Sequence, residues 1–109
     1  MRRVIIESPY AGDVERNVRY VKACVLDCLR RGESPYASHL FFTQPGILDD
    51  LKPEERNLGI EAGFAWRECA ELTVFYIDLG WSSGMVKGFE HVTENGLRWA
   101  CRKLEGEWK

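Results

Sequence analysis

Apolar and polar residues follow one another along the chain in blocks whose spacings match strands and helices. The densest apolar block, residues 72–77, is rich in β-branched and aromatic side chains, which is typical of a strand buried on both faces. It ends at Asp78, and a turn rich in serine and glycine then leads to a helical pattern that begins near Met85. The other elements can be placed around this block.

A buried strand that continues through such a turn into a helix is a common way to build a ligand crevice in α/β proteins. The free N–H groups and the positive end of the helix dipole favour a phosphate or a carboxylate at that point. A second interpretation is that Ser82 or Ser83 merely caps the helix. The two interpretations are compatible, and the sequence leaves both open.

The first third of the chain predicts a strand and a long helix. Residues 4–6 form a short apolar strand. A helix should follow from Val14 to about Arg31, because apolar side chains recur there at spacings of three, four and seven. Asp13 is placed to cap the start of this helix, and Gly32 is placed to end it.

The middle of the chain predicts a short strand and a second helix. Residues 34–42 hold at most a short strand, because Pro35 cannot donate a hydrogen bond at a central position of a sheet. Pro53 marks the first turn of a helix that extends to about Glu68. The apolar stripe of that helix consists of Leu58, Ala62, Ala65 and Trp66.

A third helix and a last strand complete the pattern. Met85, Phe89 and Val92 recur at helical spacing, and Asn95 and Gly96 end the helix. Residues 97–101 predict a final strand, and residues 103–109 form a charged tail that contains Trp108.

The order of these elements is strand, helix, short strand, helix, strand, helix, strand. It predicts an α/β fold: one doubly wound domain over residues 1–109, with a mostly parallel sheet of about four strands and helices on both faces. Ligands bind such sheets at the carboxyl ends of the strands. Three loops should therefore meet at one edge, formed by residues 7–10, 36–39 and 78–84.

Composition narrows the classes of function. The chain has 109 residues, of which 45% are hydrophobic and 29% are charged, as expected for one globular domain. A formal net charge of −2 gives no basic face for a nucleic-acid polymer. No apolar run approaches the roughly 18 residues of a membrane-spanning helix. The N-terminus is interpreted as a strand and not as a signal peptide, so a cytoplasmic location is expected.

The four cysteines do not predict a metal site. Cys24 and Cys28 share one helical face, whereas Cys69 and Cys101 lie far away in sequence. No Cys-x-x-Cys pair is present, and neither histidine is near a cysteine in sequence. We therefore expect buried free thiols, and neither a metal nor a cofactor.

Four stretches of the chain together match the motifs of a known superfamily. They are Ser-Pro-Tyr-Ala-Gly-Asp (residues 8–13), Pro-Tyr-Ala-Ser-His-Leu (35–40), Glu-Arg-Asn-Leu-Gly (55–59) and Asp-Leu-Gly-Trp-Ser-Ser-Gly-Met (78–85). In combination they resemble small phage and bacterial proteins of unknown function in the nucleoside 2-deoxyribosyltransferase-like superfamily. The resemblance covers nearly the whole chain. It implies a compact doubly wound domain, a homo-oligomer, and a nucleoside or nucleotide pocket at the strand ends.

The resemblance also implies a chemistry, the cleavage or exchange of an N-glycosidic bond. In that superfamily a glutamate attacks the anomeric carbon, much as in retaining glycosidases. This glutamate usually lies four residues after the glycine of the Ser/Gly turn. Four residues after Gly84 is Gly88, so this chain lacks the expected nucleophile. Glu90 is the nearest carboxylate in sequence. It lies two residues after Gly88, which is about 200° around the helix from that position, so its side chain should point away from the pocket.

Several side chains are candidates for contact with a nucleotide. Tyr10 and Trp81 offer aromatic faces on which a base could stack. Arg56 could neutralise a phosphate, and it falls within one of the matching stretches. Exposed positions such as Arg19 and Lys87 are weaker candidates for the same role.

Asp78 and His39 have both a functional and a structural interpretation. Asp78 could bind a ribose hydroxyl or activate water, or it could simply cap the turn after its strand. His39 could bond a base or a phosphate, or it could be held by local hydrogen bonds. The full set of expected ligand-binding residues is Ser8, Pro9, Tyr10, His39, Arg56, Asp78, Gly80, Trp81, Ser82, Ser83, Gly84 and Met85.

Three functions are compatible with these observations. The first is a nucleotide-binding protein without catalysis, for instance a phage protein that sequesters a cyclic or ADP-ribose-derived nucleotide made in host defence. The alternative is a nucleoside deoxyribosyltransferase or nucleotide N-glycoside hydrolase that uses Asp78, Glu7 or Glu90. The third is a structural or interaction protein with a vestigial crevice, in which the four tryptophans and the charged tail around Trp108 would serve a subunit interface.

Overall fold

Four parallel strands form the central sheet of the computed structural model, which describes residues 1–104 and 108. The order across the sheet is β2-β1-β3-β4. The strands are β1 (Arg2–Glu7), β2 (Glu33–Tyr36), β3 (Leu72–Tyr76) and β4 (Trp99–Arg102). Consecutive strands are joined by helical segments, so the α/β fold predicted from the alternating pattern is confirmed.

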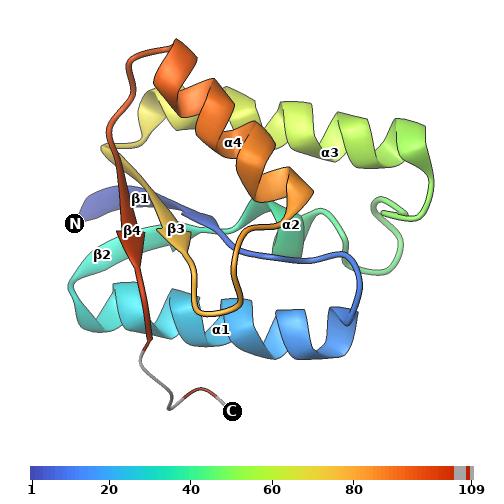
Figure 1. The fold of residues 1–109 in the computed structure, drawn as a ribbon, viewed down its shortest axis with the longest axis horizontal. Coiled ribbons are helices and arrows are strands. Elements are labelled where there is room, and N and C mark those ends of the chain that lie inside the picture. The colour runs from blue at the N-terminus through green and yellow to red at the C-terminus, as the bar shows by residue number, and fades with distance from the viewer. Residues whose placement is uncertain (105–107, 109) are drawn as a thin grey trace.

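Helices cover both faces of the sheet. Helix α1 (Val14–Arg30) lies on one face, whereas α3 (Pro53–Ala65) and α4 (Ser83–Glu94) lie on the other (Figure 1). Two short elements flank α3, the single-turn helix α2 (Ser38–Phe41) and the 3₁₀ turn η1 (Arg67–Cys69). This is the doubly wound arrangement expected from the order of elements.

The helix ends follow the predicted capping chemistry. The carboxylate of Asp13 accepts a hydrogen bond from the amide of Arg16 at 3.2 Å, which satisfies one free donor at the start of α1. Gly32 follows the same helix with φ +78°, a conformation that other residues adopt only with strain. The hydroxyl of Ser82 accepts from the amide of Met85 at 3.2 Å and caps α4.

The prediction for residues 34–42 is only partly right. Strand β2 is short and lies at the edge of the sheet, with Pro35 opposite Val4, as expected. The chain then turns into α2 at Ser38, so His39 lies on a helix and not directly after a strand.

The predicted orientation of α3 is wrong. Leu58 and Trp66, which were expected to face the core, are each 56% exposed. Gly63 is the buried residue of this helix, and a Cβ at this position would lie 2.5 Å from the hydroxyl oxygen of Ser38. Helix α3 therefore packs through a glycine, because only the missing side chain allows α2 to approach so closely.

The core divides between the two faces of the sheet. One cluster joins the sheet to α1 and consists of Val4, Ile6, Tyr20, Val21, Cys24, Cys28, Ala37, Val74 and Tyr76. The other lies under α4 and consists of Phe75, Met85 and Val92. Cys24 and Cys28 are buried and free as expected, but Cys69 and Cys101 are exposed.

The tail contributes Trp108, whose ring packs edge-on against Tyr20 at 4.8 Å between centroids. The remaining predicted tail residues, 105–107 and 109, lie outside the described part of the chain. Within the part that is described, no helix is both long enough and apolar enough to cross a bilayer.

A buried carboxylate on the α1 side connects strands that are far apart in sequence. Glu33 at the start of β2 pairs with Arg2 of β1 and with Arg102 of β4, each at 2.8 Å. Hydrogen bonds from Arg102, outweighing the effect of burial, lower the pKa of Glu33 to about 2. The ionised form is therefore strongly favoured in the folded state.

This shift predicts acid sensitivity. The pKa of Glu33 is lowered from 4.5 to about 2 on folding, so its contribution is complete above about pH 4.5 and is lost as the pH falls toward 2. Glu33→Gln should reduce the free energy of unfolding at pH 7 by up to about 3 kcal/mol. Urea denaturation at several pH values should show that the difference in free energy of unfolding between Glu33→Gln and the wild type becomes smaller at low pH.

Glu71 provides the matched control, because it pairs with Arg3 at 3.1 Å on the exposed surface. Glu71→Gln should change stability little at any pH. If the difference in free energy of unfolding between Glu33→Gln and the wild type does not vary with pH, the lowered pKa of Glu33 does not contribute to stability as described.

Candidate functional site

A cavity of about 290 Å³ opens at the carboxyl end of β1, between α2, α3 and the start of α4. From β1 the chain proceeds to β2 on one side of the sheet, whereas β3 leads to β4 on the other. The cavity therefore lies where the winding direction of the sheet reverses, which is the usual ligand position in open α/β sheets. Residues from all three predicted loops line it, so the expectation that they meet at one edge is confirmed.

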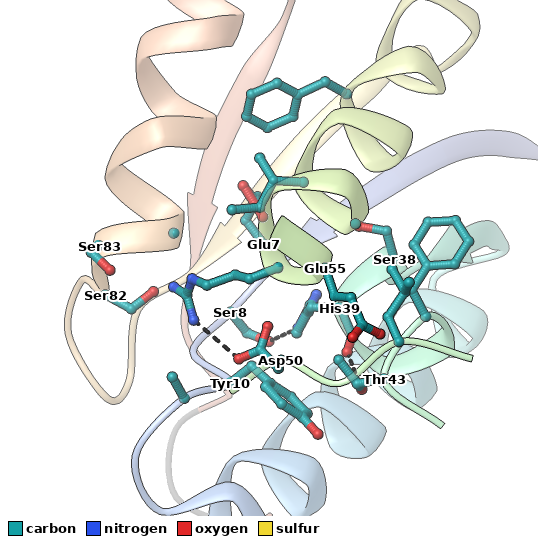
Figure 2. A pocket seen from close by; sticks show the side chains of 18 of the residues that line it. Glu7, Ser8, Tyr10, Ser38, His39, Thr43, Asp50, Glu55, Ser82 and Ser83 are labelled. Carbon is teal, nitrogen blue, oxygen red and sulfur yellow. Dashed lines mark hydrogen bonds and ion pairs between the residues drawn. The ribbon is translucent and has the colours of Figure 1, made fainter. Parts of the chain in front are cut away.

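Figure 2 shows Ser82 and Ser83 at one end of the cavity and Ser38 and Thr43 at the other, with Ser8, His39 and Asp50 between them. Acidic and basic side chains both line the walls. They are Glu7, Asp50, Glu55, Arg56 and Arg67.

The start of α4 forms the end of the cavity that is suited to an anion. Ser82, Ser83 and Gly84 line it, and the amides of Ser83 and Gly84 belong to the first helical turn, where no partner within the helix exists. The guanidinium of Arg56 lies beside them, since a Cβ on Gly84 would be 3.9 Å from Nη2. Nη1 of Arg56 pairs with Asp50 at 3.0 Å, which orients the side chain.

A buried ion pair lies deeper in the cavity. Oε2 of Glu7, at the end of β1, accepts a hydrogen bond from Nη2 of Arg67 at 2.7 Å. Arg67 also donates from Nη1 to the carbonyl of Gly88 at 3.2 Å and lies over the ring of Phe64, 4.6 Å from its centroid. Burial raises the pKa of Glu7, and the charge of Arg67 opposes this rise.

Gly88 makes room for this ion pair. A Cβ at position 88 would lie 1.8 Å from Oε2 of Glu7 and 3.1 Å from Nη2 of Arg67, so any side chain there would overlap the carboxylate. The space that the side chain of a glutamate at position 88 would need is thus occupied by the carboxylate of Glu7, which comes from β1. The glycine reflects a close contact between β1 and α4, and the site retains an acid.

Ser8 and His39 form a hydrogen-bonded pair, with 2.7 Å between Oγ and Nε2. Burial, with a smaller effect from the charge of Arg67, lowers the pKa of His39 to about 4. His39 is therefore neutral at physiological pH and adds no positive charge to the cavity. Tyr10 also lines the cavity, and its loop is held by Asn17, whose side-chain amide donates to the Tyr10 carbonyl at 2.8 Å.

Five of the expected ligand-binding residues do not line the cavity. They are Pro9, Asp78, Gly80, Trp81 and Met85. Asp78 accepts hydrogen bonds from the hydroxyl of Tyr20 on α1 and from the amide of Leu104. It thereby ties α1 and the chain after β4 to the end of β3.

Packing and turn geometry explain the positions of Trp81, Met85 and Gly80, and Pro9 is buried. Trp81 stacks on Phe75 with 5.1 Å between ring centroids, and Phe89 packs against its edge. Met85 is 1% exposed and belongs to the core under α4, and Gly80 serves the turn with φ +81°. Glu90 is exposed and outside the cavity, as its rotation around α4 predicted.

Sequence reasoning missed Arg67, Asp50 and Asn17. Arg67 lies 60 residues from Glu7, and nothing in its local sequence distinguishes it from a surface arginine. Asp50 lies just before the predicted second helix, where an acidic residue is typical of a helix start and does not mark a site. Asn17 sits among the buried residues of α1, and a polar residue on a buried stripe is a signal that could have found it.

No three histidine, cysteine, aspartate or glutamate side chains lie close enough together to hold a metal ion, within residues 1–104 and 108. The cavity's acids are instead paired with arginines or bound to backbone amides. The Oε1 atom of Glu55, for example, accepts from the amide of Asp49 at 3.0 Å.

Comparison with known proteins identifies the family. Residues 2–102 match the family model described as "Domain of unknown function (DUF7768)", so the chain belongs to that family. No curated protein matches the sequence. The family description names no activity, and the resemblance to the nucleoside 2-deoxyribosyltransferase-like superfamily stays a prediction.

The contact between Glu7 and Gly88 predicts an unequal response to two alanine substitutions in α4. Gly88→Ala should lower the free energy of unfolding by about 1–3 kcal/mol, because the new methyl group overlaps a packed carboxylate. Gly84→Ala meets nothing closer than 3.9 Å and should be neutral or stabilising by up to about 1 kcal/mol.

Denaturant unfolding of both variants measures the difference. Adding Glu7→Ala should make Gly88→Ala less costly than it is in the wild-type background, because the overlapping atoms are removed. Equal costs in the two backgrounds would show that the two residues do not share this space.

Proposed function

We propose that this member of the DUF7768 family binds a nucleoside or nucleotide in the cavity at the end of β1 and holds it without cleaving it. The observation that carries this proposal is the position of Arg56 beside the first turn of α4, with both lining the cavity. A guanidinium and free helix amides together form a strong acceptor site for a phosphate group.

Charge and volume favour a small ligand. Each acid that lines the cavity has a cationic partner: Glu7 pairs with Arg67, Asp50 pairs with Arg56, and Glu55 pairs with Lys52 at 3.6 Å. The lining therefore carries no excess of positive charge and favours one phosphate over three. A volume of about 290 Å³ lies at the small end of the range for ligand sites. A dinucleotide or ADP-ribose would need further surface, such as a second copy of the chain in a homo-oligomer.

The remaining lining residues suit a nucleoside. Tyr10 supplies an aromatic face for a base, and the neutral pair of Ser8 and His39 supplies hydrogen-bonding groups without charge. Binding without turnover is consistent with Glu7, because one of its oxygens is already engaged by Arg67. Sequestration of a signalling nucleotide requires no more than tight binding.

Titration calorimetry with nucleosides and their 5′-monophosphates tests the proposal. At least one monophosphate should bind and be recovered intact. Arg56→Gln should weaken its binding by about 10- to 100-fold, because a charged hydrogen bond is lost, and should affect the matching nucleoside much less.

Arg19→Gln is the matched control. It makes the same change in charge at an exposed residue of α1 that lies outside the cavity. Its affinity should equal that of the wild type. Equal weakening of nucleoside and monophosphate by Arg56→Gln would argue against a phosphate at this end of the cavity.

The second candidate is an N-glycoside hydrolase or deoxyribosyltransferase, and the position of Glu7 favours it. Its carboxylate occupies the space at Gly88 from which the superfamily's nucleophile would extend. In this mechanism an oxygen of Glu7 bonds to the anomeric carbon as the carbon–nitrogen bond breaks, and the base leaves with the electron pair of that bond and takes a proton from water. Water or a second base then displaces Glu7 from the sugar.

Chromatography of deoxynucleosides incubated with a high concentration of protein separates the two candidates. If the second holds, free base accumulates with the wild type and is lost with Glu7→Gln, whereas Glu90→Gln, at an exposed position outside the cavity, behaves as the wild type. Recovery of unchanged substrate from the wild type would rule out the enzyme, and only the binding function would remain.

A further inference from the structure

One oxygen of Glu7 faces the cavity without a partner. Oε2 accepts from Arg67, but within the described residues no hydrogen bond reaches Oε1. In residues 1–104 and 108, the fully buried side-chain nitrogen and oxygen atoms that lack a partner are Nε of Arg67 and Nδ1 of His91, and Oε1 is not among them. Glu7 lines the cavity, and Oε1, which has no hydrogen bond there and is not fully buried, is the oxygen of its carboxylate that remains available to a ligand.

Two glycines of α4 locate this carboxylate and the anion-binding end of the cavity relative to one another. The guanidinium of Arg56 lies at Gly84, and the carboxylate of Glu7 lies against Gly88. Four helical residues rise by about 6 Å. The two charged groups thus lie against α4 at positions that are four residues apart in sequence. A pentose that carries a phosphate on one carbon also carries ring hydroxyls, so it can offer an anion to Arg56 and a hydrogen-bond donor to Glu7 at the same time.

We propose that the cavity takes the phosphate monoester of a pentose, with the phosphate at Arg56 and the first turn of α4 and one ring hydroxyl donating a hydrogen bond to Oε1 of Glu7. This inference rests on the proposed function and adds which part of the ligand each end of the cavity binds. Arg67 is a positioning residue, because it holds Glu7 through Oε2 and leaves Oε1 directed at the ligand.

Such an arrangement selects its ligand through an unsatisfied acceptor. A carboxylate oxygen in a cavity loses hydration when a ligand enters, and a ligand without the matching hydroxyl leaves it without a hydrogen bond. Sites built to bond a ligand hydroxyl reject the deoxy analogue much more strongly than apolar sites reject a missing methylene. Glu7 therefore determines specificity for the sugar.

The test is a binding cycle between protein and ligand variants, measured by calorimetry on the full chain. The ligands are nucleoside 5′-monophosphates, their 2′-deoxy and 3′-deoxy forms, ribose 5-phosphate and inorganic phosphate. The wild type should bind the form with both hydroxyls at least tenfold more tightly than one of the deoxy forms. In Glu7→Gln this preference should fall toward one, whereas Arg56→Gln should weaken every phosphorylated ligand by a similar factor.

The outcomes separate this inference from the function on which it rests. Equal affinity of the wild type for all three sugar forms overturns the role of Glu7 and needs no variant, so a folding defect in Glu7→Gln does not obscure it. Equal weakening of all three forms by Glu7→Gln overturns it as well, while nucleotide binding stands. No binding of any phosphorylated ligand, inorganic phosphate included, overturns both.

Discussion

The contact between Glu7 of β1 and Gly88 of α4 is the constraint on which the shape of the cavity depends. The carboxylate occupies space that any side chain on α4 would need, and Arg67 closes the arrangement by bonding to Glu7 and to the Gly88 carbonyl. Burying an ion pair costs about as much in desolvation as the attraction returns, so net stability is a poor explanation for its presence. Its consequence is geometric, because it places one carboxylate oxygen at a defined depth below the start of α4.

Polar side chains have different roles on the two faces of the sheet. On the α1 side, polar side chains tie the elements together: Glu33 joins β1, β2 and β4, and Asp78 joins β3 to α1 and to the chain after β4. On the side of α3 and α4, the acids and arginines line a cavity. Asp78 illustrates this division, because it follows the central strand β3 by two residues and yet bonds to α1 and to the chain after β4, outside the cavity.

Most of the fold could be predicted because strands and helices leave periodic patterns. The boundaries of α1 and α4 follow from their spacing and capping residues, which act over a few neighbouring positions. The orientation of α3 could not be predicted from its apolar side chains. Gly59 and Gly63 have no side chain to contribute to an apolar stripe, and yet they lie on the face of the helix that packs against its neighbours. The ends of the cavity at Ser8, Tyr10 and residues 82–84 were foreseen from the topology. The pairing of Glu7 with Arg67 spans 60 residues and depends on tertiary packing alone.

Pro35 affects the surface that β2 presents at the edge of the sheet. It lies in a strand at one edge of the sheet, opposite Val4, and it carries no N–H group. Exposed edges are templates on which a foreign strand can add, and continued addition produces aggregates. A proline removes one of the donors that such an addition requires. Pro35, which β2 accommodates within its four residues, thus protects this edge of the protein against self-association of the kind that leads to fibres.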